Sequence, residues 1–407
     1  MIELLTQAFV ALQASLFESV VQPVLFALGL TTYAELGFDA VEFFLYGVIE
    51  IALIWLLLRP LESLRPVERW TDRRAVRVDV LYTLLNRLGL IPLLVFMLLA
   101  VPIGDLDGWL RLHDLIPGNL EDWLPELRER TWLSFAAYLL IIDLNEYWRH
   151  RLQHRFDFWW ALHSVHHSQR QMSFWSDSRN HLLDDLIQGV WMAAVSLLIG
   201  VPPAQFVLIL LVTRAVENLS HANLRLGFSA LGERLLVSPR FHRTHHAIGA
   251  GLKGRYRGCN FAVLFPLWDL LFGTARFDDA YAATGIGDQL QGAEYGEGFW
   301  QQQTLGVKRL LAALAPSSSS HRTADDAYAA GCPQTVQAGS LPSWIARQSA
   351  ASASNSNNRP SSDWPMPATS LSASAACMVP MMPVSGANTP ITAQRTSSTS
   401  SPTGNRQ

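Results

Sequence analysis

The sequence has 407 residues, of which 49% are hydrophobic and only 16% are charged, whereas an average soluble domain carries about 25% charged residues. The composition therefore favours a membrane protein, and a formal net charge of -3 gives no reason to expect a nucleic-acid partner. The cysteines Cys259, Cys332 and Cys377 are odd in number and widely spaced, so we expect neither a disulfide framework nor a thiolate metal site.

Apolar runs follow one another through the first half of the chain. The N-terminal residues 1–29 are apolar but carry glutamine and glutamate, so a membrane helix and an interfacial helix both remain open. Since a crossing helix needs about 20 apolar residues, we expect spans in several later runs, the last two of which are short and form separate crossings or a re-entrant pair. These runs are 41–58, 80–101, 132–148, 186–201 and 206–216. They predict an all-α, polytopic membrane helical bundle, with buried helices of a soluble protein as the alternative.

Basic residues suggest an orientation for this bundle. The segment 59–77 is rich in arginine, and Arg149, Arg151 and Arg155 follow the run 132–148. Because cytoplasmic loops of membrane proteins carry an excess of Lys and Arg, we expect both segments on the cytoplasmic side. The histidine-rich part of the chain then forms a cytoplasmic cap.

Composition divides the chain into four parts. We expect N-terminal membrane helices over 1–130 and a histidine-rich domain over 131–280. Residues 281–316 form an amphipathic surface segment with a helix over 298–314. Residues 317–407 are rich in Ser, Ala, Pro and Thr, and such a composition buries too little apolar surface to offset ordering entropy. We therefore expect a disordered, low-complexity C-terminal tail.

Histidine is concentrated in three boxes, HRLQH, HSVHH and HRTHH. Ten of the twelve histidines lie between 150 and 246, and those of the boxes are His150, His154, His163, His166, His167, His242, His245 and His246. Spacings of three and four residues place imidazoles one helical turn apart, where they can share an ion. Eight imidazoles exceed one tetrahedral site, so two ions are expected; zinc, copper, iron and nickel all suit imidazole. Histidines at lipid headgroups are the alternative.

The order of the boxes, HxxxH, HxxHH and HxxHH among membrane helices, resembles the fatty acid hydroxylase/sterol desaturase superfamily. The flanking segments DLNEYWRHRLQH, FWWALHSVHHS, SPRFHRTHHA and NFAVLFPLWDLLFGT are similar to that family as well. The resemblance covers roughly residues 130–280. It implies a non-haem diiron centre that uses O2 to hydroxylate or desaturate a lipid. The eight box histidines would be iron ligands, joined by His221 and His181, with Glu217 a further candidate because it lies four residues before His221.

The resemblance also implies partners. The sequence has no GxGxxG fingerprint after a strand, so the two electrons must come from a separate donor such as a ferredoxin, or a cytochrome with its reductase. Imidazole ligands need acceptors for their second ring nitrogen, and the available carboxylates are Asp143, Glu146, Asp177, Asp184, Asp185 and Asp269. A membrane di-zinc hydrolase and a histidine-rich metal transporter or sensor are the rival functions.

Overall fold

The computed structural model describes residues 2–113, 115, 118–248, 258–278 and 280–315. The predicted disordered tail, 317–407, lies outside these residues. Every regular element of the described chain is helical, and its single β-type pairing is an isolated bridge between Ala247 and Thr284. The all-α prediction is therefore confirmed.

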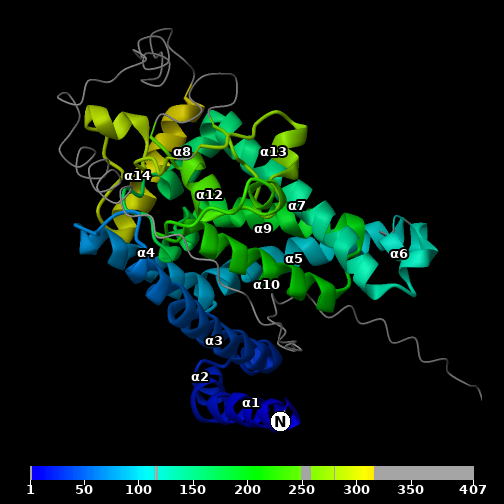
Figure 1. Cartoon of the computed structure of the whole chain (residues 1–407). Helices are drawn as coiled ribbons and strands as arrows, with labels where there is room; N and C mark the ends of the chain where they lie inside the picture. The colour runs from blue at the N-terminus through cyan, green and yellow to red at the C-terminus, as the bar shows by residue number, and fades with distance from the viewer. Residues whose placement is uncertain (1, 114, 116–117, 249–257, 279, 316–407) are drawn as a thin grey trace, which may run out of the picture.

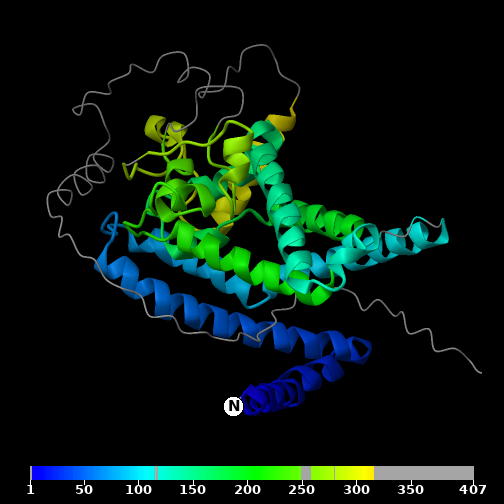
Figure 2. The ribbon, with the colours of Figure 1, turned by 45° about the vertical axis from the view of Figure 1, so that its right-hand side comes forward.

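The N-terminal helices lie at one end of the molecule (Figures 1 and 2). They are α1 (Ile2–Leu16), η1 (Phe17–Val21), α2 (Gln22–Ala27), η2 (Thr31–Tyr33) and α3 (Ala34–Leu64). The segments Glu3–Ala27 and Thr31–Leu64 are long and apolar enough to cross a membrane. Only 6% and 22% of their most apolar windows are buried, so most of these side chains face outward, as a lipid-facing surface requires.

The single span expected over 80–101 is wrong, because the chain forms two helices there, α4 (Arg73–Arg87) and α5 (Leu90–Leu112). The break falls at Gly89, whose φ of 91° suits glycine. Helix α3 crosses this break closely: a Cβ atom on Gly47 would lie 1.8 Å from the Arg87 carbonyl oxygen. Of the two helices, only α5 is long and apolar enough to cross a membrane.

The spans expected over 132–148, 186–201 and 206–216 also differ from the observed helices. Helix α7 (Thr131–Arg155) follows the short elements α6 (Leu120–Trp123) and η3 (Pro125–Leu127), and it is not among the candidate spans of the described chain. Its apolar first half is too short, since buried charged residues begin at Asp143. The predicted short pair forms two full helices, α9 (Leu182–Ile199) and α10 (Pro203–His221). Only α9 meets the requirements for a span.

The remaining helices form a cap at the end opposite the N-terminal helices (Figures 1 and 2). They are α8 (Asp157–His167), α11 (Gly232–Leu235), α12 (Pro239–His245), α13 (Leu267–Leu271), η5 (Gly287–Gln291) and α14 (Phe299–Leu314). The short helix η4 (Phe174–Ser178) instead packs on α4 and α10. The amphipathic helix expected over 298–314 is confirmed as α14, which packs on α8.

Helix α14 also ties the cap to α4 through buried side chains. The Tyr82 hydroxyl donates to Gln302 Oε1 at 2.9 Å and accepts from Gln303 Nε2 at 2.9 Å. All three residues are buried, and buried polar groups are stabilising only when they are paired in this way.

Helix α7 joins two apolar clusters and thereby positions the first histidine box. Its N-terminal half packs Tyr138 and Ile142 against Phe206 and Ile209 of α10. One to two turns later, Tyr147 packs with Val237, Phe241 and Phe261 of the cap. The helix therefore runs from the bundle into the cap, and its last two turns carry His150 and His154, both of them buried.

Candidate metal centre

Four helices end at the histidines. Helix α7 ends directly after His154, whereas α8, α10 and α12 have His167, His221 and His245 as their last residues. The last turn of a helix leaves carbonyl groups unpaired and carries the negative end of the helix dipole, which favours cations. Local sequence sets the start of α12, where the Ser238 hydroxyl accepts from the Phe241 N–H and Pro239 occupies the first turn.

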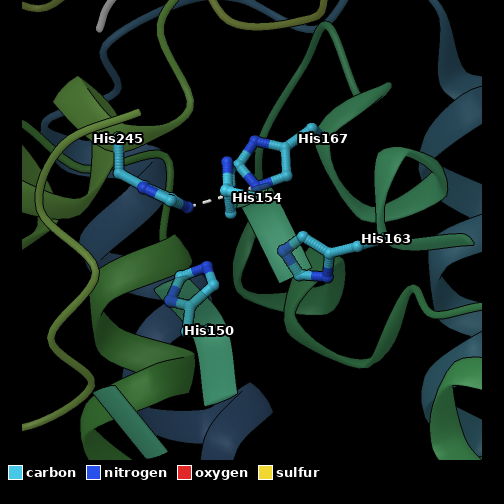
Figure 3. A group of neighbouring side chains, drawn as sticks. All are labelled: His150, His154, His163, His167 and His245. Carbon is cyan, nitrogen blue, oxygen red and sulfur yellow. Dashed lines mark hydrogen bonds between the residues drawn. The ribbon is translucent and has the colours of Figure 1, made fainter. Parts of the chain in front are cut away.

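Nine buried histidines form two groups. In the first cluster, ligand atoms of five imidazoles lie within 4.8 Å of one another, and Figure 3 shows these rings turned toward a common centre; its members are His150, His154, His163, His167 and His245. In the second cluster, His166, His221, His242 and His246 meet within the same distance. Such convergence of imidazole nitrogens is the arrangement that one metal ion per cluster requires.

The HxxHH boxes divide between the two clusters in opposite ways. In the second box, His163 and His167 belong to the first cluster and His166 belongs to the second. In the third box the pair at i and i+4 belongs to the second cluster, and the histidine between them, His245, belongs to the first. Each box therefore contributes to both clusters. The rings of His167 and His246 stack at a centroid distance of 4.3 Å, so the two clusters are adjacent.

The short distances within the second cluster are between Nε2 atoms. That of His221 lies 3.1 Å from His166 Nε2 and 3.0 Å from His242 Nε2, and His246 Nε2 is 3.1 Å from His242 Nε2. Two nitrogens bound to one ion at about 2.1 Å each and at right angles are about 3 Å apart. These spacings therefore fit shared coordination of an ion.

Backbone carbonyls orient several rings through the second ring nitrogen, Nδ1. His150 Nδ1 lies 2.9 Å from the Phe261 oxygen, and His245 Nδ1 lies 2.7 Å from the Cys259 oxygen. His163 Nδ1 faces Asp184 Oδ2 at 3.4 Å. Such acceptors fix the N–H on Nδ1 and leave Nε2 for a metal. The Nε2 atoms of His150 and His163 are buried and have no hydrogen-bond partner among the described residues, which suits this role.

Burial keeps the imidazoles neutral. It lowers the pKa of His150, His163, His166, His167, His242 and His246 well below the ordinary value, with neighbouring imidazoles adding to the effect. The pKa of His245 falls to about 4, mainly through burial. Neutral imidazole is the form that ligates a metal, so the clusters are ready to bind ions at neutral pH.

Two aspartates support the loop that supplies the carbonyl acceptors. Asp269 accepts from the N–H groups of Phe261 and Ala262 at 2.9 and 2.8 Å. Asp143 of α7 accepts from the Leu264 N–H and the Trp268 indole. The sequence marks both carboxylates as candidates to support ligands, but they act on the loop rather than on imidazole.

Asn260, between the two carbonyl acceptors, has a positive φ of 56° and donates to the Phe241 and Arg276 oxygens. Asparagine is among the few residues other than glycine that adopt this conformation readily. The sequence analysis missed the Cys259 and Phe261 carbonyls. The available signal was the segment NFAVLFPLWD, noted for its resemblance alone.

His181 is the one predicted ligand that lies outside both clusters, and its expected role needs correction. Its Nδ1 caps α9 by accepting from the Leu183 N–H at 3.1 Å, and its Nε2 lies 2.8 Å from the Gln303 carbonyl oxygen. With both ring nitrogens in hydrogen bonds, neither is left for a metal. The ligand candidate Glu217 is likewise absent from the clusters of the described residues. Its backbone oxygen holds His221 Nδ1 at 2.8 Å, and burial raises the pKa of its carboxyl to about 8.

An all-helical membrane protein with two adjacent clusters of buried imidazoles is the class that this fold and site define. Residues 135–274 match the fatty acid hydroxylase family. The matched segment contains all three histidine boxes, in agreement with the resemblance that these boxes show. No solved structure matches the chain.

Curated relatives resemble the same part of the chain. An alkylglycerol monooxygenase of Homo sapiens is 28% identical over 158 residues, which is 38% of this chain and 33% of the relative. That of Danio rerio is 30% identical over 146 residues, covering 35% and 30%. A Delta(7)-sterol 5(6)-desaturase of Gibberella zeae is 25% identical over 185 residues, covering 44% and 53%. The chain therefore spans about a third of the length of the alkylglycerol monooxygenases that it matches.

Proposed function

We propose that the protein is a membrane-bound, non-haem diiron oxidoreductase that uses O2 and external electrons to hydroxylate a lipid, with desaturation as the variant reaction. The observation that carries this proposal is the pair of adjacent, all-histidine clusters within the segment that matches the fatty acid hydroxylase family. The relatives named as a monooxygenase and a desaturase support the same class of chemistry.

The residues fit iron. Nine buried imidazoles form the two clusters, and imidazole is a good ligand for iron as well as for zinc and copper. We assign the ligands His150, His154, His163, His167 and His245 to one ion and His166, His221, His242 and His246 to the other. Bound iron would supply the activation of O2. Asp184 would orient His163, and the carbonyls of Cys259 and Phe261 would orient His245 and His150.

Hydroxylation in this scheme consumes one C–H bond, O2, two electrons and two protons, and yields C–OH and water. The electrons come from a separate donor, either a ferredoxin or a cytochrome with its reductase. The nine histidines are buried, so the protein limits the access of bulk water to both clusters, which limits loss of oxidising equivalents to side reactions. The arginine-rich segment 59–77 supports a cytoplasmic location for the cap.

Product identification tests the proposal. The full chain is expressed in a host that lacks the activity, and the host lipids are analysed under 18O2. An 18O-labelled hydroxyl lipid that depends on the gene, together with about two iron ions per chain, supports hydroxylation; a new double bond supports the desaturase variant. A protein that carries zinc and hydrolyses a lipid without O2 would instead be the di-zinc hydrolase. Metal flux across vesicles without a lipid product would indicate the transporter.

A further inference from the structure

A small cavity opens against both histidine clusters. Its volume is about 140 Å³. The wall contains His150 and His163 of the first cluster and His166, His221 and His242 of the second. Of its seventeen lining residues sixteen are polar, and Val263 is the exception. We call this cavity the polar chamber. Its composition is unusual for a lipid site, since ligand pockets are lined mostly by apolar side chains.

The three guanidinium groups of the polar chamber are already paired with carboxylates. Arg87 contacts Glu50 at 3.2 Å and Asp177 at 2.7 Å. Arg214 contacts Glu50 at 3.4 Å. Phosphate and carboxylate ligands are usually held by bidentate arginine, but here protein carboxylates occupy these positions.

The third guanidinium is also paired with a carboxylate, because Arg149 contacts Glu146 at 2.6 Å. Asp177 and Glu217 line the chamber, and Glu50 and Glu146 pair with its arginines. Four carboxyl groups thus accompany three guanidiniums. Bound ions would add positive charge and attract an anion, so the preference of the protein groups themselves is best measured without metal.

Other polar groups of the chamber are available to a ligand. The side chains of Asn86, Ser178, Gln188 and Glu217 line it and make no hydrogen bond or ion pair within the described residues. They are two amides, a hydroxyl and a carboxyl. Together they offer donors and acceptors without a net positive charge, which suits hydroxyl and ether oxygens.

We propose that the polar chamber binds the uncharged, hydroxyl-bearing end of the lipid substrate, so that the oxidised C–H bond lies beside that end and not in the middle of the alkyl chain. The identification of this ligand as the substrate rests on the proposed function. The volume agrees, because sites that enclose a drug-sized ligand measure about 300–1,000 Å³, whereas the chamber measures about 140 Å³. Only the polar end and the adjoining carbons fit, and the rest of the alkyl chain stays outside.

Binding to the metal-free, detergent-solubilised full chain tests this proposal. Dodecane-1,2-diol, dodecanoic acid and dodecyl phosphate serve as probes of equal chain length, and isothermal titration calorimetry gives the dissociation constants. We expect the diol to bind at least about tenfold more tightly than either anion, the equivalent of one well-placed hydrogen bond. Equal or tighter binding of an anion would overturn the proposal.

Variants locate the binding. Asn86→Leu and Gln188→Leu should each weaken diol binding about tenfold, whereas Gln301→Leu, an exposed position outside the chamber, should leave it unchanged. Unaltered affinity in both chamber variants would refute the site, and circular dichroism of each variant excludes misfolding as the cause of a loss.

Because this assay needs neither metal nor turnover, it succeeds or fails independently of the proposed oxygenase activity. With iron-loaded protein, we expect the new oxygen within two bonds of the diol carbons. Oxidation in the middle of the chain would contradict the proposal while leaving the oxygenase activity intact.

Discussion

The Nε2 atoms of His166 and His221 lie 3.1 Å apart, although 55 positions separate the two residues in the sequence. One residue comes from α8 and the other ends α10, so the second cluster joins a cap helix to a bundle helix. His221 lies outside the three boxes, yet it makes as many Nε2 contacts as any histidine of its cluster.

The first prediction concerns His221. The variant His221→Ala removes one of four imidazoles from the second cluster, so we expect bound iron to fall from about two ions per chain toward one. Elemental analysis of protein purified without O2 measures this. His181→Asn is the matched control, since asparagine also caps helices and His181 lies outside both clusters. Two ions retained by His221→Ala, or an equal loss in the control, would contradict the assignment.

The box histidines should be essential for turnover. We expect His163→Ala, His166→Ala and His245→Ala each to abolish the oxygenated lipid, because each removes a buried imidazole that we assign as an iron ligand, while insertion into the membrane stays largely intact. Lipid analysis of expressing cells gives the product, and membrane fractionation gives the amount of protein. Turnover that persists in all three variants would exclude these residues as ligands.

Acid should destabilise the metal-free protein. Burial lowers the pKa of eight of the nine cluster histidines in the folded chain, to about 4 for His245, whereas an unfolded histidine titrates near 6.5. Between these values the unfolded chain binds more protons. Stability is therefore fully present above about pH 6.5 and is lost as the pH falls toward about 4. Thermal unfolding of the chelator-treated protein across this range measures the slope.

The variant His245→Gln removes one titrating group, so its unfolding midpoint should depend less steeply on pH than that of the wild type. A midpoint that stays constant between about pH 6.5 and about pH 4 would show that the rings are not held neutral by burial.

Packing of α14 against His181 gives the fourth prediction. A Cβ atom on Gly306 would lie 2.3 Å from His181 Cδ2, whereas one on Gly298 would have nothing within 4 Å. Gly306→Ala should therefore destabilise the fold by about 1–3 kcal/mol through overpacking, and Gly298→Ala should not. Thermal unfolding of the two variants in detergent makes the comparison, and equal midpoints would argue against close packing of α14 at this point.

Much of the metal centre is predictable from spacing, because imidazoles three and four residues apart must share a helix face. The spacing does not predict that His166 belongs to a different cluster from His163 and His167. That division depends on how α8, α10 and α12 meet, which is a tertiary property. For the same reason His181 cannot be distinguished as a helix cap by sequence alone.

The boundaries of the membrane helices are less predictable from apolar runs than the histidine clusters are from spacing. The run 80–101 is apolar enough to suggest one helix, and the break at Gly89 depends on the close passage of α3. Asn86 and Gln188, which the sequence analysis left aside, are polar residues inside apolar runs. Polar residues within apolar segments are candidates for a functional role. Their presence was the sequence signal available for the polar chamber.

Helix α14 begins 25 residues after the family-matched segment ends at position 274, yet it packs on the helix that carries the second box and shares buried glutamines with Tyr82. A fragment trimmed to residues 135–274 would lack both α4 and α14, and it would expose the surface of α8 on which α14 packs. A fragment for expression and crystallisation should therefore extend through Leu314 and retain α4.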